Sequence, residues 1–386
     1  MRDQHQSGRR LPFLEDLSRR ERQAIERAAD QVEAERRGED DRRRKGVEAL
    51  RVAFERDLRG VLDTEAQMDL QDAIGRERLA ERDRSHPPLR SRTDDRGARR
   101  AAERRLDEVL TGRGTSRRQL RKLSTDLDAR IAEVASGIDA GVSDGYHLER
   151  NLDKWLSLSS LHQAPLPWGV LTPQDDPEDP HRWFVFRSPF FGFLFSSWSE
   201  GTDAFAVNRE LYLEPHNGWV GNKLTLDCTD GGFGEGMQAR ADAQIGFGFV
   251  PPITGLVEVI VDAQSTHGIH DVRMSDNFGF SSASAALRNY LTVSFLHPGA
   301  PENQLTPVAE AKVTSDGDDV SDRKELSKFQ HYFADVVSAK PARANETIVI
   351  AVGTRSVDIA GAHRMDVRTV SDFGWFISSV EVRVVP

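Results

Sequence analysis

Apolar side chains in the first 160 residues recur at steps of three and four, which is the period of an amphipathic helix. Two of the expected helices begin with a capping box, which is a Ser with Glu or Gln three residues later. The pairs are Ser18 with Glu21, and Ser116 with Gln119. Gly38 is expected to end the first of these helices. The pattern predicts helices over about 18–37, 46–84, 98–111, 116–138 and 146–162.

After residue 183 the period changes to two, as in a β-strand. Residues 237–250 show it best: alanines and aromatics occupy one face, while Arg240, Asp242 and Gln244 occupy the other. Asn217 and Gly218 tolerate positive φ and predict a tight hairpin between two strands. Further strands are expected over 183–186, 191–195, 206–213, 219–227, 256–261, 290–296, 329–337, 347–352 and 380–385.

Five prolines and a cluster of acidic residues between positions 165 and 180 separate these two periods. Proline at this density favours an extended spacer. We therefore predict an α+β multi-domain chain. Residues 1–162 form a charged helical assembly region, 163–182 a linker rich in Pro and Asp, and 183–386 an antiparallel all-β sandwich or jelly-roll-like domain.

The charge is divided as unevenly as the period. The first 150 residues hold 34 basic and 32 acidic side chains, but they contain only Phe13, Phe54 and Tyr146 as aromatic residues. Helices this poor in apolar surface are marginal in water. Two interpretations stay open: a bundle folded on itself, or a region that associates with copies of the chain or a partner, in a coiled-coil-like manner. Heptads are not sustained, which disfavours a strict coiled coil.

The composition disfavours nucleic-acid binding, a membrane-spanning helix and classical secretion. Arginine pairs recur in the first half, but acidic residues interleave with them and the net charge there is only +2, so we do not expect nucleic acid as a partner. The chain lacks an uninterrupted apolar run of 18 residues, so we expect no membrane-spanning helix. Cys228 is the single cysteine and no secretory segment is visible. We expect a cytoplasmic protein, or one exported without a classical signal peptide.

One short segment has the composition of a metal site. His267, His270 and Asp271 lie within five residues, and imidazole with carboxylate can bind zinc or a similar ion. The segment otherwise resembles a polar loop, and no further ligand is recognisable at a sequence spacing typical of metal sites. We expect no bound cofactor.

A second candidate site uses aromatic side chains. Trp198 and Glu200 lie in a Ser-rich segment expected to be a loop, and Asn217 and Trp219 flank the predicted hairpin. An exposed indole beside an amide or a carboxylate can contact a sugar ring and its hydroxyl groups. The alternative is that both tryptophans pack in the core.

No pair of catalytic groups stands out, so the sequence favours a non-catalytic structural or binding protein. Its helices would mediate self-association or partner docking, and its sandwich would present a surface for protein or carbohydrate within a larger assembly. The alternative is a metal-dependent hydrolase that uses the His267, His270 and Asp271 segment.

Overall fold

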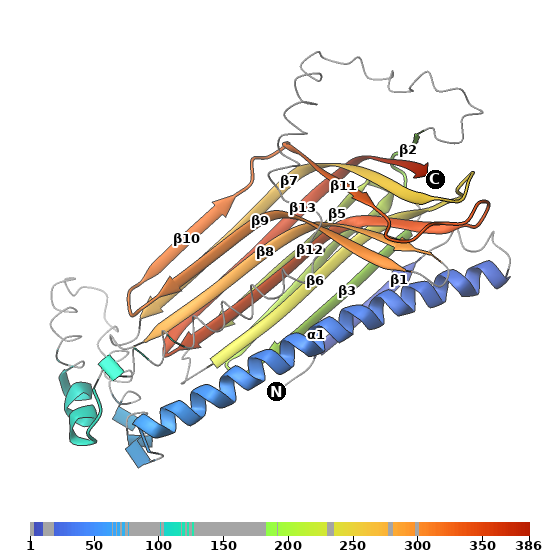
Figure 1. Ribbon diagram of the computed structural model, residues 1–386. Coiled ribbons are helices and arrows are strands. Elements are labelled where there is room, and N and C mark those ends of the chain that lie inside the picture. Colours follow the sequence, from blue (N-terminus) through green and yellow to red (C-terminus); the bar gives the residue numbers. More distant parts are fainter. Residues whose placement is uncertain are drawn as a thin grey trace.

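The computed structural model is an antiparallel β-sandwich with a long helix along one of its faces (Figure 1). It describes residues 4–10, 19–63, separate positions between 65 and 126, and then 183–190, 192–229, 235–276, 281–297 and 301–386. The predicted linker 163–182 and the predicted helix over 146–162 lie outside these residues. Within the described residues, no helix is both long and apolar enough to cross a membrane.

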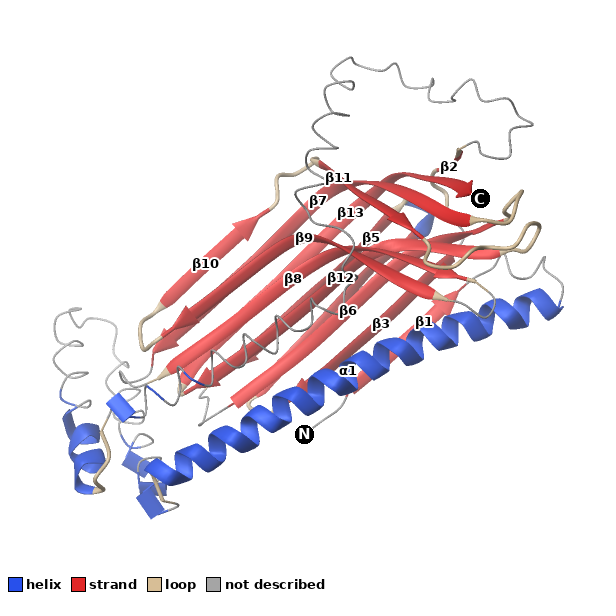
Figure 2. Cartoon of the chain, viewed as in Figure 1, coloured by secondary structure: helices blue, strands red, loops and turns tan. Residues whose placement is uncertain are grey.

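The two sheets contain thirteen strands (Figure 2). The six-stranded sheet has the order β1 (Gln4–Arg10), β3 (Gly192–Gly201), β6 (Glu235–Phe249), β12 (Ile348–His363), β8 (Ser282–Leu296) and β9 (Glu302–Ser315). The seven-stranded sheet has the order β10 (Val320–Glu325), β7 (Leu256–Asp276), β13 (Met365–Val385), β5 (Trp219–Cys228) and β4 (Phe205–Glu214), while β11 (His331–Val337) pairs with β7 and β2 (Phe184–Phe186) with β13.

The predicted β-sandwich is confirmed, and its strands are longer than the periodicity indicated. Strands β7 and β13 each have 21 residues, a length of about 70 Å at the usual rise per residue. The predicted strand 256–261 covers only the first part of β7. The hairpin between β4 and β5 is confirmed as well. Its turn is the short 3-10 helix η3 (Pro215–Asn217), and only Gly218 takes a positive φ, of 74°.

The N-terminal region differs from the prediction in two ways. Residues assigned to a helical region begin with strand β1, which pairs antiparallel with β3. The first helix also does not end at Gly38. Helix α1 (Arg19–Val61) has 43 residues in all and passes through Gly38 without a break. A glycine inside a helix costs only about 1 kcal/mol relative to alanine, which packing on the sheet can offset. The second capping box is confirmed, because the Gln119 amide donates to Ser116 Oγ at 3.3 Å.

Helix α1 packs on the outer face of the six-stranded sheet, the face turned away from the seven-stranded sheet. Ile25, Ala28, Ala29 and Val32 form one buried cluster with Leu194, Leu296, Val349 and Ala351 of β3, β8 and β12. The apolar side of this helix therefore packs on the sheet of the same chain. The strands beneath it are buried on both faces, and every residue of β12 is buried.

The interior between the sheets contains two hydrophobic clusters. Along β12 the first cluster includes Ile350 and Val352, the second includes Ala360 and Ala362, and Thr354, Ser356 and Asp358 alternate inward between them. These polar side chains are hydrogen-bonded across the sandwich, as buried polar groups generally are. Ser356 Oγ donates to Asn222 Oδ1 of β5 at 2.6 Å, and Ser371 Oγ of β13 donates to Asp358 Oδ1 at 2.6 Å.

Candidate functional site

The outer face of the seven-stranded sheet carries an open patch of aromatic side chains. Trp219 of β5 lies opposite Phe376 of β13 on one side and Glu214 of β4 on the other. Its side chain is 45 % exposed, the largest exposed ring within a described strand. Cross-strand neighbours on one face of a sheet lie within contact distance of one another. The exposed ring of Trp219 and the half-buried ring of Phe376 are therefore cross-strand neighbours on this face.

Two further rings lie on the same face, two residues along the strands. Tyr212 of β4 and His267 of β7 have ring centroids 6.1 Å apart in an edge-to-face arrangement. Between them are Gly221 of β5 and Gly374 of β13, which are paired in register. A Cβ atom on Gly221 would lie 2.9 Å from Tyr212 Cδ2, and one on Gly374 would collide with the His267 ring. The glycines thus let both rings lie close to the sheet.

Polar groups surround these rings. His267 Nε2 lies 2.9 Å from Asp372 Oδ1, and Lys223 Nζ lies 3.7 Å from Glu210 Oε1. Burial, together with the negative charges of Asp372 and Glu210, raises the pKa of Tyr212 to about 12. The phenol therefore keeps its proton at neutral pH and donates a hydrogen bond to Glu210. We call Tyr212, Trp219, His267, Asp372 and Phe376 the aromatic patch.

The four residues predicted to contact a glycan lie on two different sheets. Trp219 belongs to the aromatic patch, and Asn217 lies in the turn before it, with its Nδ2 donating to Glu214 Oε2 at 3.1 Å. Trp198 and Glu200 are not in a loop; they lie in β3 of the other sheet. Their side chains are only 5 % and 8 % exposed. For Trp198 the packing alternative is therefore correct.

The structure does not bring the three predicted metal ligands together. The segment is part of strand β7, not a loop. Adjacent strand residues point to opposite faces, so His270 lies in the interior, with Nδ1 2.9 Å from Ser371 Oγ, while Asp271 lies on the outer face and pairs with Arg273 at 3.0 Å. Within the described part of the chain, no group of three or more His, Cys, Asp or Glu side chains could hold a metal ion. The trio therefore provides no site for the hydrolase considered as the alternative function.

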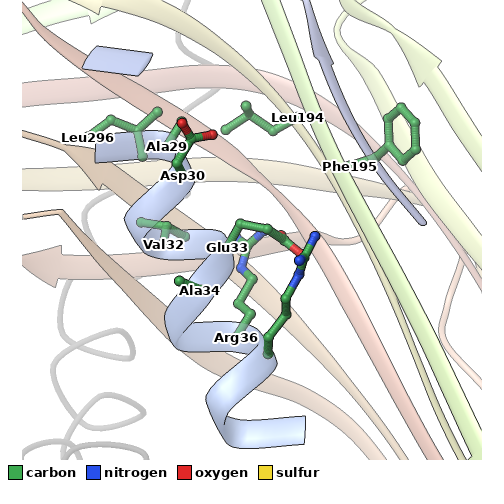
Figure 3. Close-up of a pocket in the computed structure, with 10 residues that line it drawn as sticks. Ala29, Asp30, Val32, Glu33, Ala34, Arg36, Leu194, Phe195 and Leu296 are labelled. Atoms are coloured by element: carbon green, nitrogen blue, oxygen red, sulfur yellow. The ribbon is translucent and has the colours of Figure 1, made fainter. Parts of the chain in front are cut away.

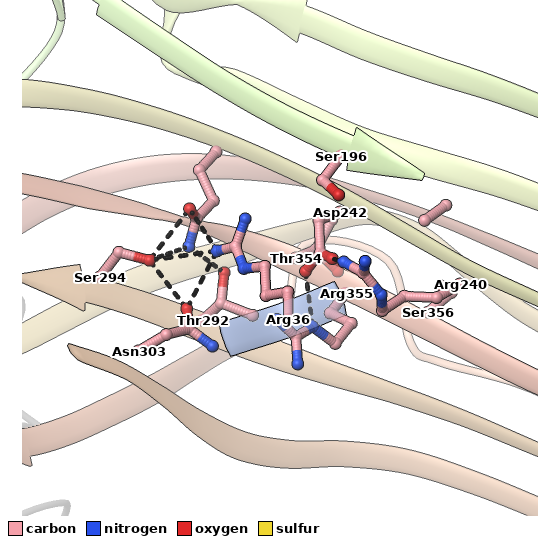
Figure 4. A network of polar contacts seen from close by, with 12 residues as sticks. Arg36, Ser196, Arg240, Asp242, Thr292, Ser294, Asn303, Thr354, Arg355 and Ser356 are labelled. Carbon is pink, nitrogen blue, oxygen red and sulfur yellow. Dashed lines mark hydrogen bonds and ion pairs between the residues drawn. The ribbon is translucent and has the colours of Figure 1, made fainter. Parts of the chain in front are cut away.

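The outer face of the six-stranded sheet, which α1 covers in part, contains a group of buried charged and polar side chains (Figure 4). Asp242 of β6 is fully buried and pairs with Arg240 of the same strand and with Arg355 of β12, whose Nε lies 2.5 Å from Asp242 Oδ1. Burial alone would raise the pKa of Asp242, but Arg355, Arg240 and Arg36 together hold that pKa well below its usual range. We call Arg36, Arg240, Asp242 and Arg355 the covered charge cluster.

Arg36 reaches this cluster from helix α1. Its Nη2 donates to three neutral oxygens: Gln244 Oε1 at 3.2 Å, Ser294 Oγ at 3.3 Å and Asn303 Oδ1 at 3.3 Å. Burial lowers the pKa of Arg36 to about 10, although the negative charge of Asp242 opposes this shift. The side chain is still charged at neutral pH. It connects α1 to strands β6, β8 and β9.

Neither a protein-family model nor a curated protein sequence matches this chain. Among solved structures, it has a weak likeness to a family 4 carbohydrate-binding module, with 12 % identity and a TM-score of 0.13, covering 51 % of this chain and 91 % of that one. The family 11 carbohydrate-binding module from Clostridium thermocellum has 12 % identity and a TM-score of 0.12, covering 47 % and 89 %. The GH26-CBM35 mannanase from Podospora anserina has 11 % identity and a TM-score of 0.13, covering 53 % and 28 %. TM-scores this low carry no conclusion about a ligand.

Proposed function

We propose that this protein is a non-catalytic binding module that recognises carbohydrate through the aromatic patch on its seven-stranded sheet. The observation that carries the proposal is the half-exposed indole of Trp219 beside the rings of Phe376 and Tyr212 on an otherwise polar sheet face. An aromatic face provides apolar contact for the C–H groups of a sugar ring. The Asp372 carboxylate and the Tyr212 hydroxyl oxygen supply acceptors for its hydroxyl groups.

The patch fits a neutral sugar better than a strongly charged partner. Its ionic groups are already paired with one another: His267 with Asp372, and Lys223 with Glu210. No single sign of charge dominates, so a polyanion gains little from this face. The rings of the patch lie on four neighbouring strands, so an extended saccharide that crosses these strands contacts several rings in turn.

Binding of the full chain to a glycan array, followed by calorimetry on the best ligand, tests this proposal. We expect W219A to weaken binding by about tenfold or more, because it removes the largest exposed ring. F329A is the matched control, since Phe329 is 68 % exposed but lies outside the patch. Wild-type protein that binds no glycan, or W219A protein that binds as tightly as F329A, would contradict the proposal.

The proposed self-association of the helical region must use other residues than its first apolar stripe. Ile25 and Val32 are covered by the sheet, whereas Val52, further along α1, is 55 % exposed. We propose that copies of the chain contact one another through this later part of the helix. Sedimentation of the full chain should show an oligomer that V52D dissociates, while V250D, at a residue 51 % exposed in the loop after β6, leaves it intact. A monomeric wild type at tens of micromolar would refute this part of the proposal.

A further inference from the structure

A pocket of about 480 Å³ lies between helix α1 and the outer face of the six-stranded sheet (Figure 3). Most of its lining is apolar and comes from α1, β3 and β8: Ala29, Val32, Ala34, Leu194, Phe195 and Leu296. Small-molecule sites in proteins have this size and this mainly apolar lining, with a few polar groups that fix the orientation of the ligand. The charged side chains of this pocket all come from α1.

Arg36 is the buried charge in this lining. Its side chain is 5 % exposed, and the three oxygens on the sheet to which its Nη2 donates are neutral. Its Nε is buried and has no hydrogen-bond partner among the described residues. Asp242 is the carboxylate of the covered charge cluster, but both of its oxygens are engaged by Arg240 and Arg355. Among the described residues, Arg36 is thus a buried cation that no carboxylate contacts directly.

The acidic side chain beside it has other partners. Glu33 lies one helical turn before Arg36 and also lines the pocket. Its carboxylate pairs with Arg37 Nε at 3.6 Å and accepts from Ser196 Oγ at 3.3 Å. Its carboxylate is therefore engaged elsewhere, although its negative charge also acts on Arg36 through space. Isolated buried cations are unfavourable, and a bound anion with hydrogen-bond geometry relieves that cost.

We propose that this pocket binds an apolar molecule that carries a carboxylate, such as a medium-chain fatty acid. The carboxylate bonds to the Arg36 guanidinium, and the hydrocarbon chain packs against Val32, Leu194 and Leu296. Each part of the ligand meets the matching part of the lining: an ion for the buried ion, and methylene groups for the apolar wall. This site is on the opposite sheet from the aromatic patch and does not depend on the proposed carbohydrate binding.

Calorimetry with two probes of equal chain length separates the two contributions. Octanoate has both the chain and the charge, and octanol has the chain alone. We expect the full-length protein to bind octanoate about tenfold or more tightly than octanol at neutral pH, because the charge-assisted bond to Arg36 exists only with octanoate. Equal affinity for the two probes, or no binding of octanoate, would overturn the proposal. Acetate, which has the charge without the chain, should bind more weakly than octanoate.

Variants then assign the effect to Arg36. R36Q should lose the preference for octanoate but keep its affinity for octanol. R27Q is the matched control, since Arg27 is an exposed arginine of the same helix that does not line the pocket, and it should keep the preference. If the melting curve of R36Q shows that it does not fold, R36K provides the test, because it retains the charge and should retain most of the preference. An R27Q protein that loses the preference as fully as R36Q, or an R36K protein that loses it, would contradict the assignment.

Discussion

The two outer faces of this sandwich carry polar side chains in the same alternating pattern, but they have opposite environments. On β6 of the six-stranded sheet, Arg240, Asp242 and Gln244 are buried beneath a covering that includes α1. On β4 and β5 of the seven-stranded sheet, Glu210 and Lys223 remain partly exposed. The same strand periodicity therefore produces a sealed charge cluster on one face and an open recognition surface on the other.

The comparison shows that binary patterning identifies the inner face of a strand but not the environment of its outer face. Alternation places the alanines of β6 in the core, and the structure confirms this. Whether the polar positions between them reach water depends on a helix about 200 residues earlier in the chain. A charge in the covered cluster should consequently contribute far more to stability than a charge on the open face.

The largest expected effect is that of D242N. The substitution leaves Arg240 and Arg355 buried without the carboxylate that both contact. Breaking a buried ion pair from one side costs about 3–5 kcal/mol, and we expect a loss of this size in the free energy of unfolding. Urea denaturation monitored by circular dichroism measures it. A loss below that of an ordinary surface substitution would show that the cluster is not sealed.

The interior between the sheets provides a pH-dependent test. Burial raises the pKa of Asp358 to about 8, against a weaker opposing effect from the Ser371 hydrogen bond. Between its unfolded and folded pKa values the folded state binds a proton that the unfolded state lacks. Asp358 therefore destabilises the protein by about 1.4 kcal/mol per unit as the pH rises from 5 to 8.

Denaturation at several pH values tests this slope directly. D358N should remove the contribution, because asparagine has no proton to lose. Burial lowers the pKa of His270 to about 4, so below pH 6.5 this histidine acts in the opposite direction and stability falls as the pH falls. His297 and His363, whose pKa values burial also lowers, act in the same direction as His270. These histidine contributions are common to wild type and D358N, so the difference between their slopes from pH 6.5 to 8 isolates Asp358. Identical slopes for wild type and D358N in that window would contradict the burial of its charge.

A smaller effect is expected where α1 contacts the sheet. Ile25 is fully buried against the six-stranded sheet, and I25V should cost about 1 kcal/mol of unfolding free energy through the lost methylene group. V52A, on the exposed part of the same helix, should change it by less than about 0.5 kcal/mol. Equal effects in thermal melts would mean that α1 does not dock through its first stripe.

The smallest effect is expected on the open face. D372N removes the partner of His267, but both side chains are partly exposed, with relative exposures of 22 % and 34 %. Exposed ion pairs contribute at most about 1 kcal/mol. We expect D372N to be near that limit or below it in the same urea titration used for D242N. A loss equal to that of D242N would remove the distinction between the two faces.

The sequence predicted the antiparallel β-sandwich and most of its strand positions because alternation and turn residues are local signals. It did not predict strand β1, since Gln4–Arg10 has no apolar alternation and is defined only by its pairing with β3. It also placed His267, His270 and Asp271 in a loop, because the inward positions of this part of β7 include Gly268 and His270 instead of apolar residues, which interrupts the alternation. In the candidate site only Trp219 was identified for the proposed role, while His267 was singled out as a metal ligand. Asp372 and Phe376 lie near Trp219 through the pairing of β13 with β5, for which no local signal exists. Tyr212 lies there through the β4–β5 hairpin, whose turn the sequence did predict.

The measurement that most directly tests the contrast between the faces is thiol labelling of two single substitutions under native conditions. S196C places a thiol on the covered face, where Ser196 is fully buried and contacts Glu33 of α1. N208C places one on exposed β4, and the natural Cys228 is buried. We expect S196C to react about a hundredfold more slowly than N208C, because the buried thiol reacts only when the covering of the sheet opens locally. Equal rates would show that the six-stranded sheet is not covered and would contradict the account.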